Sequence, residues 1–188
     1  MKRHFNIFFI VPFFFLVALG PPNAWTKSID EICEEKGISP CRSSIVIVKA
    51  KRRLFLYLEG KFVKAYPVVV GKNPHEQKLY EGDCCTPEGI FRVVSKRVHE
   101  KWSRFILVNY PTWDDVKRHR KACAEGLIPL NGDSCVGVGG DIGIHGTHSE
   151  ELNRSRVDWT DGCISLFNPD IEEFFPYVER GDLVFIVP

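Results

Sequence analysis

The stretch from Asp141 to Asn168 determines how the rest of the chain is interpreted: it begins D-I-G-I-H-G-T-H and, after a polar connection, ends D-W-T-D-G-C-I-S-L-F-N. The short apolar run from Ile142 to Ile144 predicts a strand that ends at His145. Cys163 follows a glycine and opens a segment that leads into an expected helix. A cysteine and a histidine that are distant in sequence, at the ends of neighbouring elements, are the arrangement that a thiol nucleophile needs.

The residues beside Cys163 and His145 suit acyl-transfer chemistry. At a turn into a new element, the N–H groups of Gly162 and Cys163 would be free to favour a thiolate and to stabilise an oxyanion. Gly146 leaves its carbonyl accessible to orient one ring nitrogen of His145, the best candidate for a general base. Taken in isolation, the same residues are equally compatible with a buried structural cysteine and a satisfied core histidine.

A zinc site is a second interpretation of the same part of the chain. His145, His148 and Cys163, together with Asp161, contain the right ligand types. The two histidines are three residues apart, which on a strand places them on opposite faces, and the chain has no H-E-x-x-H helix motif. We therefore expect no metal and no organic cofactor.

The remainder of the chain predicts a single, mostly β domain. Runs rich in β-branched and aromatic residues predict strands, at 45–48, 54–58, 62–70, 90–98, 105–109 and 183–187. Helices are expected at 28–36, 113–125 and 168–178, the last with Asn168 as N-cap and Pro169 at the first helical position. The helix at 113–125 is expected to act as a lid over the cleft or to cap the fold.

Composition limits the possible partners. The chain has 188 residues, 44% of them hydrophobic, and a formal net charge of +1. This length supports one sizeable core. Without a basic surplus or a basic–aromatic run, no nucleic-acid partner is expected.

The N-terminus resembles an export signal. Lys2, Arg3 and His4 precede an apolar stretch from Phe5 to Leu19, which is short for a membrane span. We expect residues 1–24 to be a signal peptide or an N-terminal anchor, residues 25–43 a polar segment, and residues 44–188 the functional domain. Export would place the protein in the periplasm or cell envelope, with membrane contact only through an uncleaved leader.

Export also affects the cysteines. The chain has seven, so at least one is unpaired within a monomer. Cys33 and Cys41 are close enough in sequence to form a disulfide that closes a short N-terminal loop. The adjacent Cys84 and Cys85 would strain if joined to each other, so each is expected to need a distant partner such as Cys123 or Cys135. The alternative is that several are free buried thiols.

Several coupled motifs, in order, carry a resemblance to a known family. The sequence is similar to the L,D-transpeptidase catalytic domain of bacterial cell-wall enzymes, whose motif is a His followed, after a loop, by Ser/Thr-His-Gly-Cys. His145-Gly146-Thr147 matches the first half, and Thr160-Asp161-Gly162-Cys163 matches the second. The similarity extends from about Ser44 to Val187 and includes Tyr66-Pro-Val-Val-Val-Gly71, Gly82-Asp83, Thr86-Pro-Glu-Gly89, Tyr110-Pro111 and Asp158-Trp-Thr160.

The resemblance implies a fold, a reaction and roles for residues. The fold would be a curved β-sandwich with a few peripheral helices. Cys163 would attack a peptidoglycan tetrapeptide stem, with His145 moving the proton and the Gly146 carbonyl holding its tautomer. Amides of Asp161, Gly162 and Cys163 would form the oxyanion hole, shaped by Thr160. The acyl group would pass to an amine on another stem, to an envelope lipoprotein lysine, or to water, as in L,D-carboxypeptidases and murein hydrolases.

Two positions depart from the family pattern. Asp161 replaces the His that usually precedes Gly-Cys, and its charge would raise the pKa of the thiol unless the carboxylate faces away. If Asp161 abolished turnover, the protein would be a module that binds the cell wall without catalysing a reaction. Ser165 stands where the family often has Asn or Arg. Weaker candidates for substrate contact are Trp159, as a pocket wall, and Asp83 and Thr86, which are expected to fix a turn near the cleft.

Overall fold

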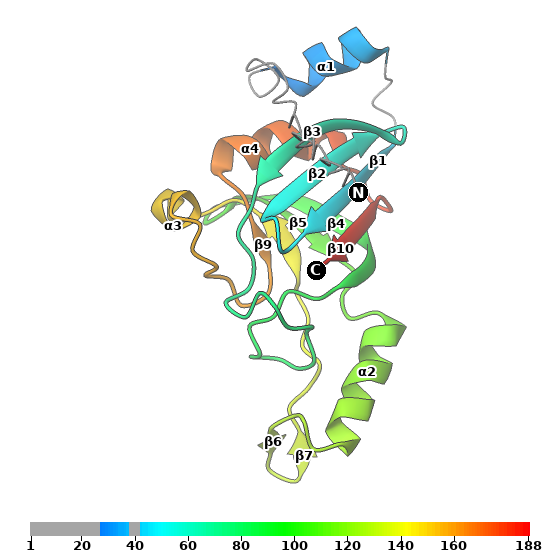
Figure 1. Cartoon of the computed structure of the whole chain (residues 1–188), viewed down its shortest axis with the longest axis vertical. Coiled ribbons are helices and arrows are strands. Elements are labelled where there is room, and N and C mark those ends of the chain that lie inside the picture. Colours follow the sequence, from blue (N-terminus) through cyan, green and yellow to red (C-terminus); the bar gives the residue numbers. More distant parts are fainter. Residues whose placement is uncertain (1–26, 38–41) are drawn as a thin grey trace, which may run out of the picture.

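The structure is a computed structural model that describes residues 27–37 and 42–188. Figure 1 shows a curled sheet with short helices around it. Its strands are β1 (Ser43–Val48), β2 (Arg53–Leu58), β3 (Lys61–Pro67), β4 (Gly89–His99), β5 (Ser103–Val108), β6 (Leu130–Asn131), β7 (Ser134–Cys135), β8 (Gly143–His145), β9 (Ile164–Ser165) and β10 (Leu183–Val187). The helices are α1 (Ile29–Lys36), α2 (Trp113–Ala124), α3 (Glu150–Arg154) and α4 (Asn168–Phe174), followed by the 3-10 turn Phe175–Tyr177.

One sheet organises the described part of the chain. Its strand order is β3-β2-β1-β10-β4-β5-β8-β9, and β6 pairs separately with β7. The two parallel pairs are β1 with β10 and β8 with β9, and the other pairs are antiparallel. The mostly β fold expected from the sequence is confirmed, and its curvature takes the form of a single curled sheet.

Alternation of apolar and polar residues explains how the first strands pack. In β1 the buried residues Ile45 and Ile47 face Leu56 and Leu54 of β2 across the antiparallel pair. All four are fully buried. Because strand side chains alternate between faces, one face of this hairpin builds the core. Helix α4 adds Ile171 and Phe174 to the same core.

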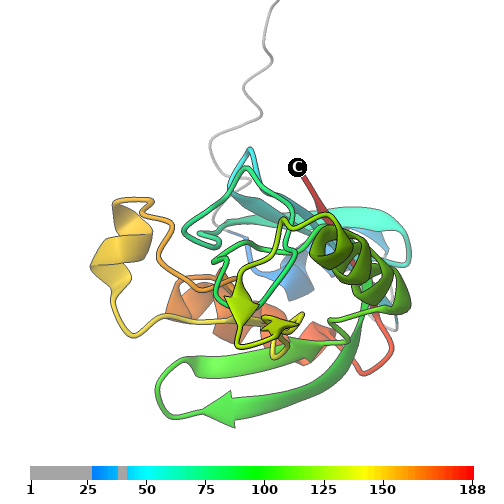
Figure 2. The same ribbon diagram turned by 90° about the horizontal axis from the view of Figure 1, so that it is seen from below.

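The segment between β5 and β8 extends away from the sheet. Helix α2 and the β6–β7 hairpin lie beyond the end of the sheet in Figure 1 and next to each other in Figure 2. A capping box between Thr112 and Asp115 starts α2. The Cys123–Cys135 disulfide ties the helix to the hairpin.

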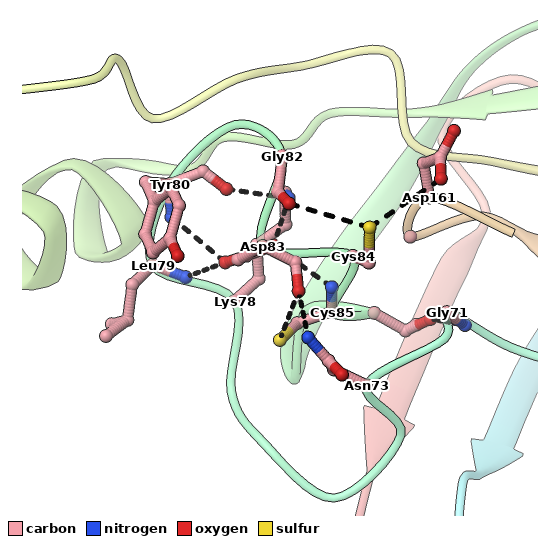
Figure 3. A network of polar contacts seen from close by, with 12 residues as sticks. Gly71, Asn73, Lys78, Leu79, Tyr80, Gly82, Asp83, Cys84, Cys85 and Asp161 are labelled. Carbon is pink, nitrogen blue, oxygen red and sulfur yellow. Dashed lines mark hydrogen bonds and ion pairs between the residues drawn. The ribbon is translucent and has the colours of Figure 1, made fainter. Parts of the chain in front are cut away.

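A long loop between β3 and β4 is held by buried charges. Lys49 is 1% exposed and bonds Glu88 Oε1 at 2.7 Å, Glu76 O at 2.9 Å and Thr86 O at 3.3 Å. Further along, the Asp83 carboxylate accepts from Lys78 Nζ at 2.7 Å and from three backbone amides, those of Leu79, Tyr80 and Cys85 (Figure 3). A buried carboxylate with this many donors is fully compensated, so it holds the loop in one conformation.

Several predictions about the cysteines are corrected or lie outside the described residues. Cys123 and Cys135 pair with each other, so neither is a partner for Cys84 or Cys85, which are both free thiols. The β6–β7 hairpin brings Cys135 back to the end of α2, where Cys123 lies, and so allows the two cysteines to pair. The expected Cys33–Cys41 clip and the leader at 1–24 involve residues outside the described ranges.

Some predicted element boundaries also differ. The helix expected at 168–178 ends at Phe174 and is followed by the 3-10 turn Phe175–Tyr177. The strand expected at 62–70 ends at Pro67, since proline donates no ladder hydrogen bond, and Val69 instead bridges Ser165. Phe167, not Asn168, is the N-cap of α4. No helix within the described ranges is long and apolar enough to cross a membrane.

Candidate active site

The parallel pair β8–β9 brings His145 and Cys163 to one face of the sheet. Ile144 pairs with Ile164 and His145 pairs with Ser165, so Cys163 lies two positions before the partner of His145. Because side chains alternate along extended backbone, the two side chains project to the same side. Both line a cavity of about 240 Å³. Trp102, Trp159, Thr160, Asp161 and the 140–142 segment complete its wall.

Aromatic rings enclose His145. Its side chain is 2% exposed, and the indole of Trp102 stacks on it with centroids 4.5 Å and planes 22° apart. Trp159 meets it edge-on at 5.9 Å, and Phe105 lies parallel at 5.9 Å. This enclosure leaves the imidazole little freedom to rotate. Burial lowers the pKa of His145 to about 4, and the Gly146 hydrogen bond acts in the opposite direction.

One carbonyl sets the tautomer of His145. Nδ1 lies 2.5 Å from Gly146 O, so Nδ1 carries the hydrogen and donates, leaving Nε2 as an acceptor. The same carbonyl accepts from Ser165 Oγ at 3.1 Å. Ser165 in turn accepts from Asn153 Nδ2 at 3.2 Å, and Asn153 Oδ1 accepts from Trp159 Nε1 at 2.9 Å. A buried hydrogen-bond chain therefore fixes the group that orients the histidine.

The backbone after His145 is fixed by α4. Asn168 Oδ1 accepts from the Thr147 amide at 2.8 Å, and its Nδ2 donates to the Thr147 carbonyl at 3.0 Å. A Cβ on Gly146 would lie 2.2 Å from Asn168 Oδ1 and 2.6 Å from Trp102 O. Glycine at this position is therefore required by close packing.

The Cys163 thiol is a neutral group in this state. Its side chain is partly exposed, with Sγ 3.6 Å from Asp141 O. Burial of the thiol among protein atoms disfavours the thiolate and raises the pKa of Cys163 to about 11, and the nearby Asp161 charge acts in the same direction. The backbone N–H of Gly143 lowers it. The imidazole that lines the same cavity is also uncharged, so the two side chains are a neutral thiol and a neutral imidazole rather than a thiolate and an imidazolium.

Asp161 is held by groups on the neighbouring loop. Its Oδ1 lies 2.7 Å from Lys72 Nζ and 3.6 Å from Cys84 Sγ (Figure 3 shows the Cys84 contact). The Lys72 hydrogen bond lowers the pKa of Asp161, so the carboxylate is ionised. The charge that replaces the usual histidine is thus partly neutralised, but it still raises the pKa of Cys163.

The amides around Cys163 differ from the expected oxyanion hole at one position. The Gly162 amide donates to Thr160 Oγ1 at 3.2 Å, and that hydroxyl donates to Cys163 O at 2.6 Å. The Gly162 amide is therefore not a free donor, because it is hydrogen-bonded to the Thr160 hydroxyl within the turn. The amides of Asp161 and Cys163 donate no hydrogen bond to any described residue.

Gly162 is required by its conformation and surroundings. Its φ is +136°, and a Cβ there would lie 2.8 Å from Cys85 O and 3.0 Å from Ile142 Cδ1. The loop built around Asp83 thus packs directly against the residue before Cys163. Asp83 itself does not line the cavity.

The other expected substrate contacts are reassigned by burial. Trp159 lines the cavity, as predicted for a pocket wall. Ser165 and Thr86 are fully buried, Asp83 is 7% exposed, and none of the three lines the cavity. Ser165 bonds Gly146 O, and Thr86 Oγ1 accepts from the Gly71 amide at 2.9 Å. Among the described residues, no group of three or more His, Cys, Asp or Glu side chains is arranged to hold a metal ion.

Four residues of the site were not singled out by the sequence: Trp102, Asn153, Asn168 and Lys72. Trp102 comes from the β4–β5 turn, and its Nε1 is buried without a partner among the described residues. Asn168 was assigned to a helix cap, where asparagine is common. Trp102 contacts His145 and Lys72 contacts Asp161, whereas Asn153 and Asn168 bond Ser165 and Thr147. Nothing in their local sequence indicates these contacts, because each joins segments that are separated along the chain.

Comparison with known proteins is consistent with this geometry. A protein-family model described as the L,D-transpeptidase catalytic domain matches residues 42–186. A search of the curated proteins finds no matching sequence. Among solved structures, the chain is similar to Bd1075 of Bdellovibrio bacteriovorus, with a TM-score of 0.54 and 19% identity over 80% of this chain and 49% of that chain.

Two further solved structures share the fold. The helical cell shape determining protein Pgp2 of Campylobacter jejuni matches with a TM-score of 0.53 and 23% identity, over 84% of this chain and 54% of that chain. An L,D-transpeptidase from Mycobacterium smegmatis matches with a TM-score of 0.50 and 14% identity, over 78% and 59%. The chain therefore spans between about half and three fifths of the length of these structures.

Proposed function

The chain belongs to the L,D-transpeptidase catalytic domain family, and from this premise we propose that it is an exported peptidoglycan L,D-transpeptidase. Cys163 is the nucleophile and His145 is the general base. The family acts on peptidoglycan peptide stems, and the donor substrate proposed for this chain is a tetrapeptide stem. The observation that carries the proposal is the shared cavity of Cys163 and His145, with His145 Nε2 left as an acceptor.

The first half-reaction forms a thioester. As Sγ attacks the carbonyl carbon of the stem amide, Nε2 of His145 takes the thiol proton. The amides of Asp161 and Cys163 are the available donors for the resulting oxyanion. Collapse of the tetrahedral intermediate breaks the C–N bond, and His145 returns the proton to the leaving amine, the terminal D-alanine.

The second half-reaction resolves the thioester. An amine from another stem attacks the acyl carbon, loses a proton to His145, and displaces the thiolate, which then recovers that proton. An envelope lipoprotein lysine would react in the same way. Water in place of the amine would give an L,D-carboxypeptidase or murein hydrolase with the same residues.

The protonation states support proton transfer during attack. Burial lowers the pKa of His145 to about 4 and raises that of Cys163 to about 11. Around neutral pH both groups are uncharged, so the base is available and the thiol keeps its proton until substrate arrives. Substrate entry displaces water from a cavity walled by Trp102 and Trp159, which strengthens the interactions that stabilise the oxyanion.

Two features support export. The leader at 1–24 has the charge and apolar pattern of a signal sequence. The Cys123–Cys135 disulfide is a bond that persists in oxidising compartments. The proposed location is the periplasm or cell envelope.

The test is a reaction of purified protein with a disaccharide tetrapeptide, followed by intact-protein and product mass spectrometry. The transpeptidase predicts a transient acyl adduct on Cys163 and a cross-linked dimer as product. Cys163→Ala should abolish both, and Cys33→Ala is the matched control at a buried thiol outside the cavity. An adduct that resolves only to tripeptide would show that water is the acceptor. Binding without adduct or product, with the thiol confirmed free, would replace the enzyme by a wall-binding module.

A further inference from the structure

A second cavity beside the active site concentrates positive charge. It measures about 310 Å³, and its wall contains four arginines: Arg52, Arg53, Arg154 and Arg156. Arg52 and Arg53 come from the turn into β2, whereas Arg154 and Arg156 come from the end of α3 and the residues after it. None of the described residues that line this cavity carries a carboxylate. Since the whole chain has a net charge of only +1, this arrangement is local.

The four guanidinium groups differ in whether they have anionic partners. Arg52 is satisfied by Asp158, with Nε 2.9 and 3.0 Å and Nη2 2.7 Å from the carboxylate oxygens. Arg154 has only an exposed ion pair with Glu150 at 3.8 Å, which contributes little. The guanidinium groups of Arg53 and Arg156 have no hydrogen bond or ion pair with any described residue. Their donors are therefore available to an incoming anion.

The rest of the cavity selects among anions. Pro67 and Phe167, which are partly exposed, provide an apolar surface beside the arginines, and the buried Val68 completes this part of the wall. A free inorganic ion would leave this surface unused. A planar carboxylate attached to aliphatic atoms would use both parts, because the guanidinium fork binds carboxylates in a bidentate manner.

The cavity shares a structural wall with the active site. Asn153 lines it, bonds Trp159 of the catalytic cavity, and begins the chain that reaches Gly146 O. Asp158, which holds Arg52, also accepts from the Val70 amide at 3.0 Å and immediately precedes Trp159. A peptide with its reacting amide at Cys163 could therefore extend past Trp159 towards the arginines.

We propose that this arginine cavity binds a free carboxylate of a peptidoglycan stem peptide and so positions that stem for reaction at Cys163. The proposal rests on the function proposed above and adds a subsite to it. Arg53 and Arg156 make the contacts with the carboxylate, and Arg52 with Asp158 holds the cavity wall. The arginines contact a part of the substrate remote from the reacting bond. Their removal should therefore raise KM and leave kcat nearly unchanged.

The test compares two double variants that lose the same charge. Arg53→Gln with Arg156→Gln removes the proposed contacts, and Arg120→Gln with Arg180→Gln removes exposed arginines elsewhere. Calorimetry on a Cys163→Ala background would measure binding of disaccharide tetrapeptide without turnover. We expect the first pair to weaken binding about tenfold and the control pair to leave it unchanged.

A chemically altered probe makes the test independent of the variants. Tetrapeptide with its carboxylates converted to amides should bind the wild-type site as weakly as the unaltered peptide binds the Arg53/Arg156 variant. Equal binding of both peptides to wild type would overturn the proposal. Displacement of the tetrapeptide by millimolar inorganic phosphate, with no effect of amidation, would assign the cavity to phosphate instead and also overturn it.

The outcomes separate this proposal from the proposed function. An adduct on Cys163 that forms with the same KM in wild type and in the Arg53/Arg156 variant would preserve the transpeptidase and reject the subsite. Binding that depends on Arg53 and Arg156, without any adduct in the protein with Cys163 intact, would preserve the subsite and reject the enzyme.

Discussion

The indole of Trp102 lies flat against the imidazole of His145, with ring centroids 4.5 Å and planes 22° apart. This contact excludes water from one face of the imidazole. It therefore contributes to the burial that lowers the pKa of His145 to about 4. An imidazole stacked in this way is neutral at ordinary pH and cannot rotate away from Gly146 O. The protonation state of the candidate site is thus a consequence of packing between two segments of the chain.

The pH dependence of acylation should follow from these pKa values. Below a pH of about 4, His145 is protonated and cannot accept the thiol proton. We expect kcat/KM for adduct formation to stay level on lowering the pH through 6.5 and to fall only near pH 4. Stopped-flow mass spectrometry across pH 3.5–8 would measure this fall in rate on the acid side. Circular dichroism at the same pH values would show whether the protein remains folded. An acid limb close to the ordinary histidine value would contradict the neutral, buried base.

Ser165 should act as a positioning residue for His145. Its hydroxyl donates to the carbonyl that sets the imidazole tautomer, and it receives a hydrogen bond from Asn153. We expect Ser165→Ala to lower kcat about fivefold with little change in KM, since one buried hydrogen bond is worth about 1 kcal/mol. Ser95→Ala, at an exposed position of β4, is the control. Combining Ser165→Ala with Asn153→Ala should be less than additive; fully additive effects would show that no such chain operates.

Lys72 and Asp161 should have opposite effects on the pKa, and so on the reactivity, of the Cys163 thiol. The Asp161 charge raises the pKa of Cys163, and Lys72 offsets it through its 2.7 Å contact. Asp161→Asn should therefore speed alkylation of Cys163 by iodoacetamide at neutral pH, whereas Lys72→Gln should slow it. Because both side chains are exposed, the Lys72 effect should shrink at high salt. Equal rates in both variants would mean that Asp161 does not act on the nucleophile.

Gly162 should tolerate no side chain. A Cβ there would lie 2.8 Å from the Cys85 carbonyl, in a backbone conformation with φ +136°. We expect Gly162→Ala to lower the free energy of unfolding by about 2 kcal/mol and to abolish the adduct. Urea unfolding would measure the first effect. Gly60→Ala is the matched control, since Gly60 also has a positive φ but no atom within 4 Å of a Cβ. Equal losses in the two variants would attribute the effect to conformation alone.

Much of the fold could be predicted from local sequence. The alternation of apolar and polar residues in 45–48 and 54–58 requires two strands with one buried face, and both are present in β1 and β2. Turn residues and charge placement predicted α2 to within one residue. Elements with strong periodicity are determined locally, because the conformation that pairs their backbone groups also gathers their apolar side chains on one face that can be buried.

Local sequence was insufficient where side-chain partners are distant. Asn168 has the position of a helix cap, but its amide bonds Thr147 across 21 residues. Cys123 and Cys135 were expected to be partners for Cys84 and Cys85, yet the hairpin brings them to each other. Ser165 was expected to touch substrate, but the β8–β9 register buries it beneath Gly146. In each case several partners were chemically possible, and only the folded arrangement selects one.

The sequence by itself determined the identities of Cys163 and His145 as candidates, the glycines beside them, and the mostly β architecture. These depend on residue type and short-range pattern. The tertiary structure alone decided the protonation of the pair, the use of the Gly162 amide by Thr160, the neutralisation of Asp161 by Lys72 and the convergence of four arginines. The physical reason is that pKa values, hydrogen-bond partners and charge clusters depend on distances between residues that are remote in the chain.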